Sequence, residues 1–214
     1  MLQAFSKFLD GYRTRTYQKG QTILHQGDTP SHAYVIKSGF TKMFEISALG
    51  ENKALIFDQQ FEIFPIGWVF HKIVAAQFYY EAFTECEAYL VPREDILHFF
   101  KSDPTSMFEI FDYFISRHLA FQERILALEQ PKAADKILFT LKFLTDRFSI
   151  KAGKSNSAQI NLPLTHQEMA GFIGLTRETT GIELKKLEKL GIISYKNQCY
   201  IVNLVKLNKL MDTK

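Results

Sequence analysis

The stretch Leu164–Ile193, LTHQEMAGFIGLTRETTGIELKKLEKLGII, decides how the C-terminal part of the chain folds. Thr165, with Glu168 three residues later, forms a capping box, the sequence pattern with which many helices begin. Gly174 should end that helix, because glycine adopts the left-handed conformation at a helix C-terminus at the least cost. Thr176 is then suited to be the N-cap of a second helix. The stretch therefore predicts two short helices joined by a tight turn.

The second predicted helix carries apolar residues on one side and polar residues on the other. Those that should face the core recur at helical spacing: Ile182, Leu184, Leu187 and Leu190. The outward part contains Arg177, Glu178, Thr180 and Lys185. In a DNA major groove, an arginine can donate to both O6 and N7 of guanine, and a glutamate can accept from N4 of cytosine. Arg177 and Glu178 are therefore the predicted base-reading residues.

Two features around this stretch also favour DNA. The run IISYKNQCYIV after Gly191 predicts two short strands and a turn, a wing that would place Lys196 near a phosphate. From Pro131 onward there are 14 Lys and Arg against 7 Asp and Glu, a net charge of +7, whereas residues 1–130 have a net charge of −4. A basic excess of this kind favours phosphate contacts. A helix pair that packs only within its own domain, or against another protein, is the alternative.

The N-terminal half has a different character. From Tyr17 to about Val91, β-type runs alternate with turn signals, and glycines recur at short spacing. No helical pattern separates these runs, so we expect an antiparallel barrel or roll and not parallel βαβ units.

A long helix should follow Pro104, because neither proline nor glycine occurs between Thr105 and Glu129. A seam with coiled-coil spacing runs along it: Met107, Phe111, Phe114, His118, Phe121, Ile125 and Leu128. This seam predicts a homodimer, and the alternative is a helix that packs within one monomer. A second apolar stripe should face the roll: Phe108, Ile115, Leu119 and Leu126. Pro131 should end the helix and act as a hinge, with a helix at 132–148 and a polar loop at 151–159 after it.

These pieces resemble the family of the cyclic-AMP receptor protein and the fumarate-nitrate reductase regulator (CRP/FNR). The resemblance rests on Gln167-Glu168, the central glycine, TRET at Thr176–Thr179, the tail LKKLEKLGII, and the N-terminal pieces YQKGQTILHQGD and AYVIKSGFTKMFE, so it covers nearly the whole chain. It implies an α+β fold: an antiparallel β-roll, or cyclic-nucleotide-binding-like jelly roll, at 1–103, a dimerisation helix at 104–130, and a winged helix-turn-helix DNA-binding domain at 131–214.

The resemblance also implies a function. Members of this family are homodimeric transcription regulators that bind two-fold symmetric double-stranded DNA and contact RNA polymerase. Thr165, Gln167, Thr176 and Thr179 match family positions that contact phosphates or support the recognition helix. A third base-reading arginine of the family corresponds here to Ile182, so we expect a different operator sequence.

A cyclic-nucleotide pocket is a further implication, but the residues depart from it. Gly67 is present, whereas Trp68 occupies the position of the ribose-binding glutamate, and Ala76 and Gln77 occupy those of an Arg-Ser pair. A buried phosphate without that arginine would be poorly compensated. We therefore expect no response to cyclic nucleotides. The candidate effector pocket comprises Phe64, Gly67, Trp68, His71, Ala76, Gln77 and Tyr79.

The aromatic residues of this region allow two interpretations. They either fill the former cavity or line a pocket for an apolar or planar ligand, and haem bound through His71 is a further alternative. No cofactor is predicted, and an iron-sulfur cluster is not expected, because no cysteine precedes Cys86.

Other classes of protein are not indicated. No apolar run approaches the roughly 20 residues that span a bilayer, and no signal peptide is recognisable, so we expect a cytoplasmic protein without membrane contact. Cys86 and Cys199 lie far apart, and no metal site is predicted. Catalytic motifs such as GxSxG, HExxH or a P-loop are absent, so no catalytic residue is assigned and an enzyme is not expected. The remaining class is a protein-interaction adaptor without DNA binding.

Overall fold

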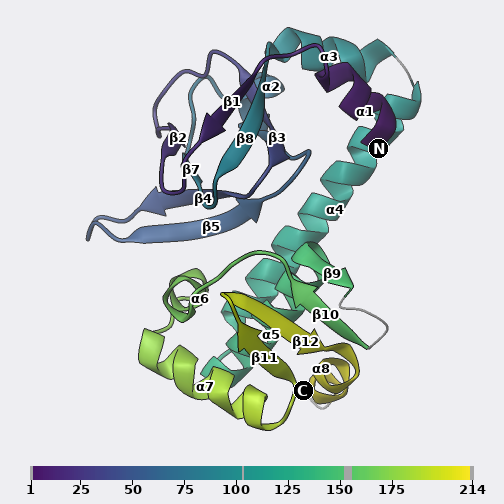
Figure 1. Cartoon of the computed structure of the whole chain (residues 1–214). Helices are drawn as coiled ribbons and strands as arrows, with labels where there is room; N and C mark the ends of the chain where they lie inside the picture. Colours follow the sequence, from purple (N-terminus) through teal and green to yellow (C-terminus); the bar gives the residue numbers. More distant parts are fainter. Residues whose placement is uncertain (1, 103, 152–155, 213–214) are drawn as a thin grey trace. The chain divides into compact units, whose positions relative to one another are not determined.

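The computed structural model describes residues 2–102, 104–151 and 156–212. The chain forms two compact units, Met1–Phe114 and Ile115–Lys214 (Figure 1). The division falls within α4 (Pro104–Glu129), which is the long helix predicted after Pro104. Within the described ranges, no helix is both long and apolar enough to cross a membrane.

The first unit contains two antiparallel four-stranded sheets, with the orders β1-β8-β3-β6 and β2-β7-β4-β5. Their strands are β1 (Thr14–Tyr17), β2 (Thr22–Leu24), β3 (Ala33–Ser38), β4 (Thr41–Ile46), β5 (Asn52–Asp58), β6 (Ile63–Phe64), β7 (Tyr79–Ala82) and β8 (Cys86–Val91). The antiparallel roll predicted from Tyr17 to Val91 is therefore confirmed.

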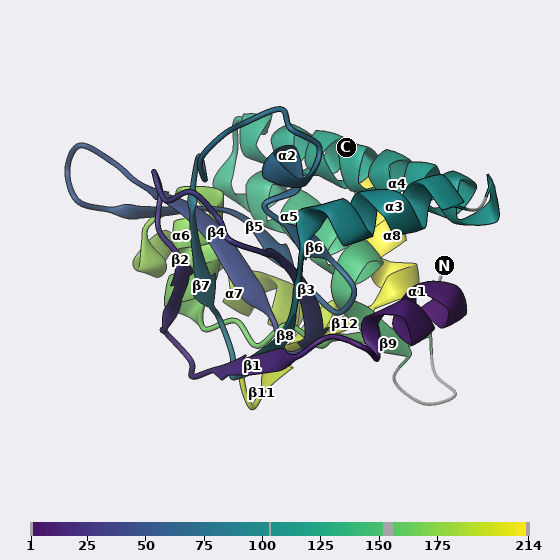
Figure 2. The same cartoon turned by 90° about the horizontal axis from the view of Figure 1, so that it is seen from above.

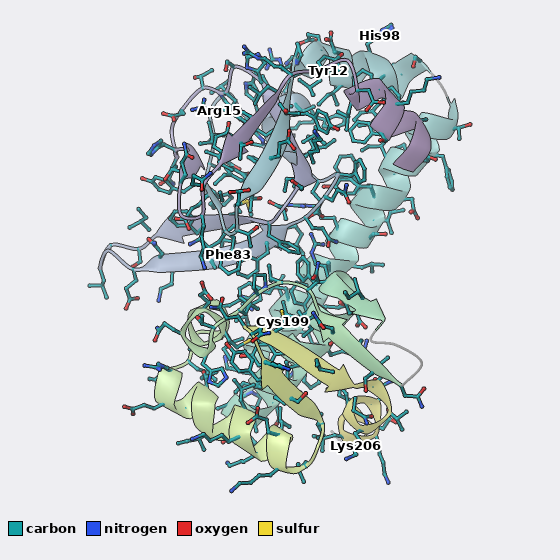
Figure 3. All side chains as sticks on the ribbon, viewed as in Figure 1. Tyr12, Arg15, Phe83, His98, Cys199 and Lys206 are labelled. Carbon is teal, nitrogen blue, oxygen red and sulfur yellow. The ribbon has the colours of Figure 1, made fainter. Side chains whose placement is uncertain are left out.

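Helices pack on the first of these sheets: α1 (Leu2–Leu9), α2 (Ile66–Val69), α3 (Arg93–Ser102) and the start of α4. Figures 1 and 2 show α1 and α3 at the same end of the roll. The ring of Phe8 stacks on that of Phe99 at 4.5 Å. Tyr12, labelled in Figure 3, donates from Oη to Asp95 Oδ2 at 2.9 Å. Neither α1 nor α3 was predicted from the sequence.

The second unit holds the C-terminal elements and a sheet of order β11-β12-β10-β9. They are α5 (Ala133–Phe148), β9 (Ser149–Lys151), β10 (Ser157–Ile160), α6 (His166–Ile173), α7 (Arg177–Lys189), β11 (Ile193–Lys196), β12 (Cys199–Asn203) and α8 (Leu204–Met211). The predicted helix at 132–148, the helix pair and the two-stranded wing are confirmed.

The polar loop expected at 151–159 is partly wrong. Residues 152–155 lie outside the described residues, but Ser157–Ile160 forms β10 and pairs with both β9 and β12. The physical reason is alternation, because Ala158 and Ile160 point into the core while their polar neighbours are half-buried.

The prediction that a second stripe of α4 faces the roll is also wrong. Phe108 is 76% exposed, and Ile115, Leu119 and Leu126 are exposed as well. The buried side of the helix is formed instead by Ile110, Tyr113, Arg117, Arg124 and Ala127. Two arginines therefore occupy positions that hydrophobic periodicity cannot identify. Of the predicted seam, Met107, Phe111, His118 and Ile125 are exposed, and Phe114, Phe121 and Leu128 are half-buried.

Two glycines of the roll provide a matched test of this fold. Gly20 and Gly39 both have φ of +82°, but a Cβ on Gly39 would overlap the backbone oxygen of Glu85, whereas one on Gly20 would meet nothing within 4 Å. We expect G20A to lower the free energy of unfolding by about 1 kcal/mol through backbone strain, and G39A by about 1–3 kcal/mol more through the added clash. Urea unfolding measures both, and equal losses would contradict the packing described for Gly39.

Candidate nucleic-acid interface

Both ends of α6 are fixed by local hydrogen bonds. Thr165 Oγ1 accepts from the backbone N–H of Glu168 at 3.1 Å, and Glu168 Oε2 accepts from the backbone N–H of Thr165 at 2.7 Å. Gly174 ends the helix with φ of +68° and ψ of +35°, the left-handed conformation. The predicted capping box and glycine C-cap are therefore confirmed.

The first turn of α7 is held in the same way. Thr176 Oγ1 accepts from the backbone N–H of Thr179 at 3.1 Å and donates to Thr179 Oγ1 at 2.9 Å. At the other end of the helix, Lys206, labelled in Figure 3, donates from Nζ to the backbone oxygen of Leu190 at 3.0 Å. Contacts at its beginning and its end thus position α7 within the second unit.

An open hollow of about 780 Å³ lies along the outward face of α7. It is lined by His166, Thr176, Arg177, Glu178, Gly181, Ile182 and Lys185. Four of the predicted DNA-binding residues therefore meet on one surface: Thr176, Arg177, Glu178 and Lys185. An arginine, a lysine and a carboxylate at the start of one helix provide the donors and the acceptor that base edges and phosphates require.

The other predicted DNA-binding residues lie around this hollow. Thr165 and Thr179 are half-buried and belong to the two caps, and Gln167 is exposed on the first turn of α6. Lys196 is exposed at the end of β11, beside the two-residue turn in which Asn197 and Gln198 both have positive φ.

The structure corrects the predicted faces of α7. Thr180 is fully buried, and its Oγ1 has no hydrogen-bond partner within the described ranges, so its assignment to DNA is wrong. Its neighbour one turn on, Leu184, belongs to the core. Ile182 and Leu190 are 57% and 58% exposed, so their assignment to the buried side is wrong too. Ile182 instead shares the outward face with Glu178 and Lys185, at spacings of four and three residues.

His166 was not predicted from the sequence to belong to this surface. It is the first residue of α6, and its ring lies 4.6 Å from that of Tyr195 in the wing. A polar side chain directly after a predicted N-cap is a usable signal, because a helix N-terminus favours anions.

The candidate effector residues are not brought together in one pocket. Phe64 stacks between Tyr34 at 5.2 Å and Tyr80 at 4.7 Å in the interior of the roll. Trp68 is buried and lies under the guanidinium of Arg93, whose Cζ is 4.7 Å from the ring centroid. Tyr79 has other partners again, with Phe44 at 5.2 Å and His25 at 5.9 Å.

The remaining candidates lie on the loop at 71–77, which forms an open hollow of about 460 Å³. The backbone N–H of Ala76 donates to Asp28 O at 2.8 Å, and its carbonyl oxygen accepts from Gly27 N at 2.8 Å. His71 Nε2 lies 3.4 Å from Glu94 Oε1 at the surface. Gly67 approaches Ile73, which a Cβ on Gly67 would meet at 3.2 Å. No cluster of three or more His, Cys, Asp or Glu suited to a metal occurs in the described part of the chain.

Two family models match the chain, one for each kind of domain. The model of the cyclic nucleotide-binding domain matches residues 14–103, and the model of the Crp-like helix-turn-helix domain matches residues 137–210. The second match contains α6, α7 and the hollow beside them.

Full-length relatives have the same combination. The anaerobic regulatory protein of Haemophilus influenzae is 25% identical over 194 residues, which are 89% of this chain and 73% of that protein. FixK2 from Bradyrhizobium japonicum has a similar fold, with a TM-score of 0.76 and 18% identity over 93% of this chain and 96% of FixK2. CprK in complex with OCPA has a TM-score of 0.69 and 17% identity over 98% of this chain and 94% of that chain. At these identities, the two solved structures establish the fold alone.

Proposed function

We propose, from the premise that this chain belongs to the CRP/FNR family of DNA-binding transcription regulators, that it acts as a homodimer. Each protomer would place α7 in one of two successive major grooves, with half-sites about one helical turn apart. The observation that carries this proposal is the hollow along the capped first turn of α7, where Arg177, Glu178, Ile182 and Lys185 meet.

We assign different roles to these side chains. Arg177 and Glu178 would read bases, because they lie in the first turn and are exposed. Ile182 would contact the methyl group of a thymine, the one apolar feature of a base edge in the major groove. Lys185 and the wing residue Lys196 would contact phosphates, together with Thr165, Gln167, Thr176 and Thr179. The buried Thr180 has no place in this set.

The proposed dimer would form along α4. The exposed side of this helix carries Phe108, Phe111, Ile115, Leu119, Ile125 and Leu126. Large apolar side chains at such spacing, exposed to solvent along one helix, are typical of an interface. Relative to the predicted seam, we move its centre from Phe114 and Phe121, which are half-buried within their own protomer, to Ile115 and Leu119.

The β-roll would not respond to cyclic nucleotides. Trp68 and Ala76 occupy the positions of the charged ligands, and the N–H of Ala76 is already bonded to Asp28 O. The stacked rings of Tyr34, Phe64 and Tyr80 support a filled interior. The alternative is an apolar effector. CprK, with its similar fold, binds OCPA.

The regulator would act on RNA polymerase, as the family resemblance implies. A protein-interaction adaptor without DNA binding remains the alternative of a different class. It would lack salt-dependent binding to duplex DNA, because that dependence arises from the counterions that bound phosphates release.

Arg177 provides the test of base reading. The cognate duplex is first selected from a random-sequence pool with the unaltered protein. We expect R177A to weaken binding to this duplex by about 1–3 kcal/mol and to relax specificity at one base pair. As the matched control, K185A should weaken cognate and random duplexes alike. Fluorescence anisotropy measures both, and an equal loss on the two duplexes for R177A would make Arg177 a phosphate contact.

Leu119 tests the dimer. L119E would bury a carboxylate in an apolar interface, so we expect the dissociation constant of the dimer to rise by about two orders of magnitude. The control is L49E, at the exposed tip of the β4–β5 hairpin (Figure 2), which should leave the dimer unchanged. Sedimentation equilibrium measures both variants. A monomeric unaltered protein, or an L119E variant that still dimerises, would contradict the proposed interface.

Calorimetry tests the roll. We expect cyclic AMP at millimolar concentration to give no saturable heat, because the charged ligands for its phosphate and ribose are missing. A titration of the same sample with the selected duplex shows that the protein is active. Saturable binding of one nucleotide per protomer would contradict the filled pocket, and a Soret band in protein from its own source would establish haem instead.

A further inference from the structure

A buried arginine joins α4 to the first helix of the DNA-binding motif. Arg124 is 5% exposed, and its guanidinium covers the ring of Phe172, with Cζ 3.4 Å from the ring centroid. Its Nη2 donates to the backbone oxygen of the same residue. Both residues belong to the second unit, and Phe172 lies in the last turn of α6.

Stability alone is a poor explanation of this contact. Nε and Nη1 of Arg124 have no hydrogen-bond partner among the described residues, and burial lowers the pKa of the guanidinium to about 9. Removing a cation from water is costly, and an apolar side chain of similar volume is often as stable or more stable at such a site. A buried cation is therefore better explained by the geometry that it imposes.

That geometry is directional. A guanidinium is planar, and it stacks on rings while donating in its own plane. Because Arg124 contacts both the ring and the carbonyl oxygen of Phe172, it restricts the orientation of α6 on α4. An apolar contact would permit sliding, since hydrophobic burial has no direction. The carbonyl also suits a cation, because the last turn of a helix carries unpaired oxygens and the negative end of the helix dipole.

Two further contacts hold the C-terminal end of α4. Lys136 of α5 donates from Nζ to the backbone oxygen of Leu128, across the predicted hinge at Pro131. Gln130 donates from Nε2 to the backbone oxygen of Leu126 at 3.0 Å. The C-terminal part of α4 thus has polar contacts with both α5 and α6.

We propose that Arg124 is a positioning residue that holds α6, and with it α7, in one orientation on α4. The spacing of two recognition helices in a dimer would then be set by α4 and not by a free hinge at Pro131. This proposal rests on the proposed function for its consequence on DNA, but the orientation itself can be tested without DNA.

The DNA-free test is hydrogen exchange of the full chain. In R124M, we expect the amides of α6 and of residues 128–136 to exchange about tenfold faster, while those of the β-roll stay unchanged and the Tm is not lowered. R117M is the matched control, because it removes a second buried guanidinium of α4 whose ring contact, Phe121, is on the same helix. Unchanged exchange in α6 of R124M, or a uniform increase across the chain, would overturn the proposal.

The DNA test uses the duplex selected by the unaltered protein, with the two half-sites moved one and two base pairs apart or together. We expect the unaltered protein and R117M to prefer one spacing by about tenfold, and R124M to lose most of this preference while binding a single half-site normally. A preserved spacing preference in R124M overturns the proposal and leaves the proposed function intact. If the unaltered protein selects no paired half-sites, the proposed function fails, and the exchange measurement still decides the role of Arg124 in orientation.

Discussion

Thr176 Oγ1 holds the first turn of α7, where it accepts from the backbone N–H of Thr179, and the rest of the second unit depends on where that turn starts. The left-handed Gly174 determines the angle at which α7 leaves α6. Once the start is fixed, the helical period allots each side chain to a face. Thr180, Leu184 and Leu187 enter the core, so Arg177, Ile182 and Lys185 must point outward. A start shifted by one residue would rotate the helix by about 100° and bury the arginine.

Local signals explain which features could be predicted from the sequence. The capping box at Thr165, the glycine at 174 and the Lys196–Cys199 turn depend on residues within four positions of one another, and the structure confirms each. Faces within α7 were harder, because Thr180 and Ile182 exchange the places that their polarity suggests. A helix only two turns beyond its cap has too few apolar residues to fix its phase by counting.

Tertiary partners explain the rest. The candidate effector residues are close in sequence, yet their rings pair with residues from distant strands, Tyr34 with Phe64 and Phe44 with Tyr79. Proximity along the chain therefore gave a single pocket where the fold separates the side chains. The wrong second face of α4 has the same origin, because only the folded unit shows that Arg117 and Arg124 are buried.

The two sides of α4 are the reverse of what a helix of a monomeric protein would have. Its inward side buries two guanidinium groups, and its outward side exposes Phe108, Phe111 and Ile115 to solvent. In an isolated chain both choices are unfavourable, because charges lose hydration and large apolar surfaces keep theirs. Both become favourable if a second copy covers the outward side, and if the inward side needs direction more than burial. The dimer and the Arg124 contact thus support each other: a recognition helix held at a fixed angle to α4 is useful only where α4 also fixes the position of a second one.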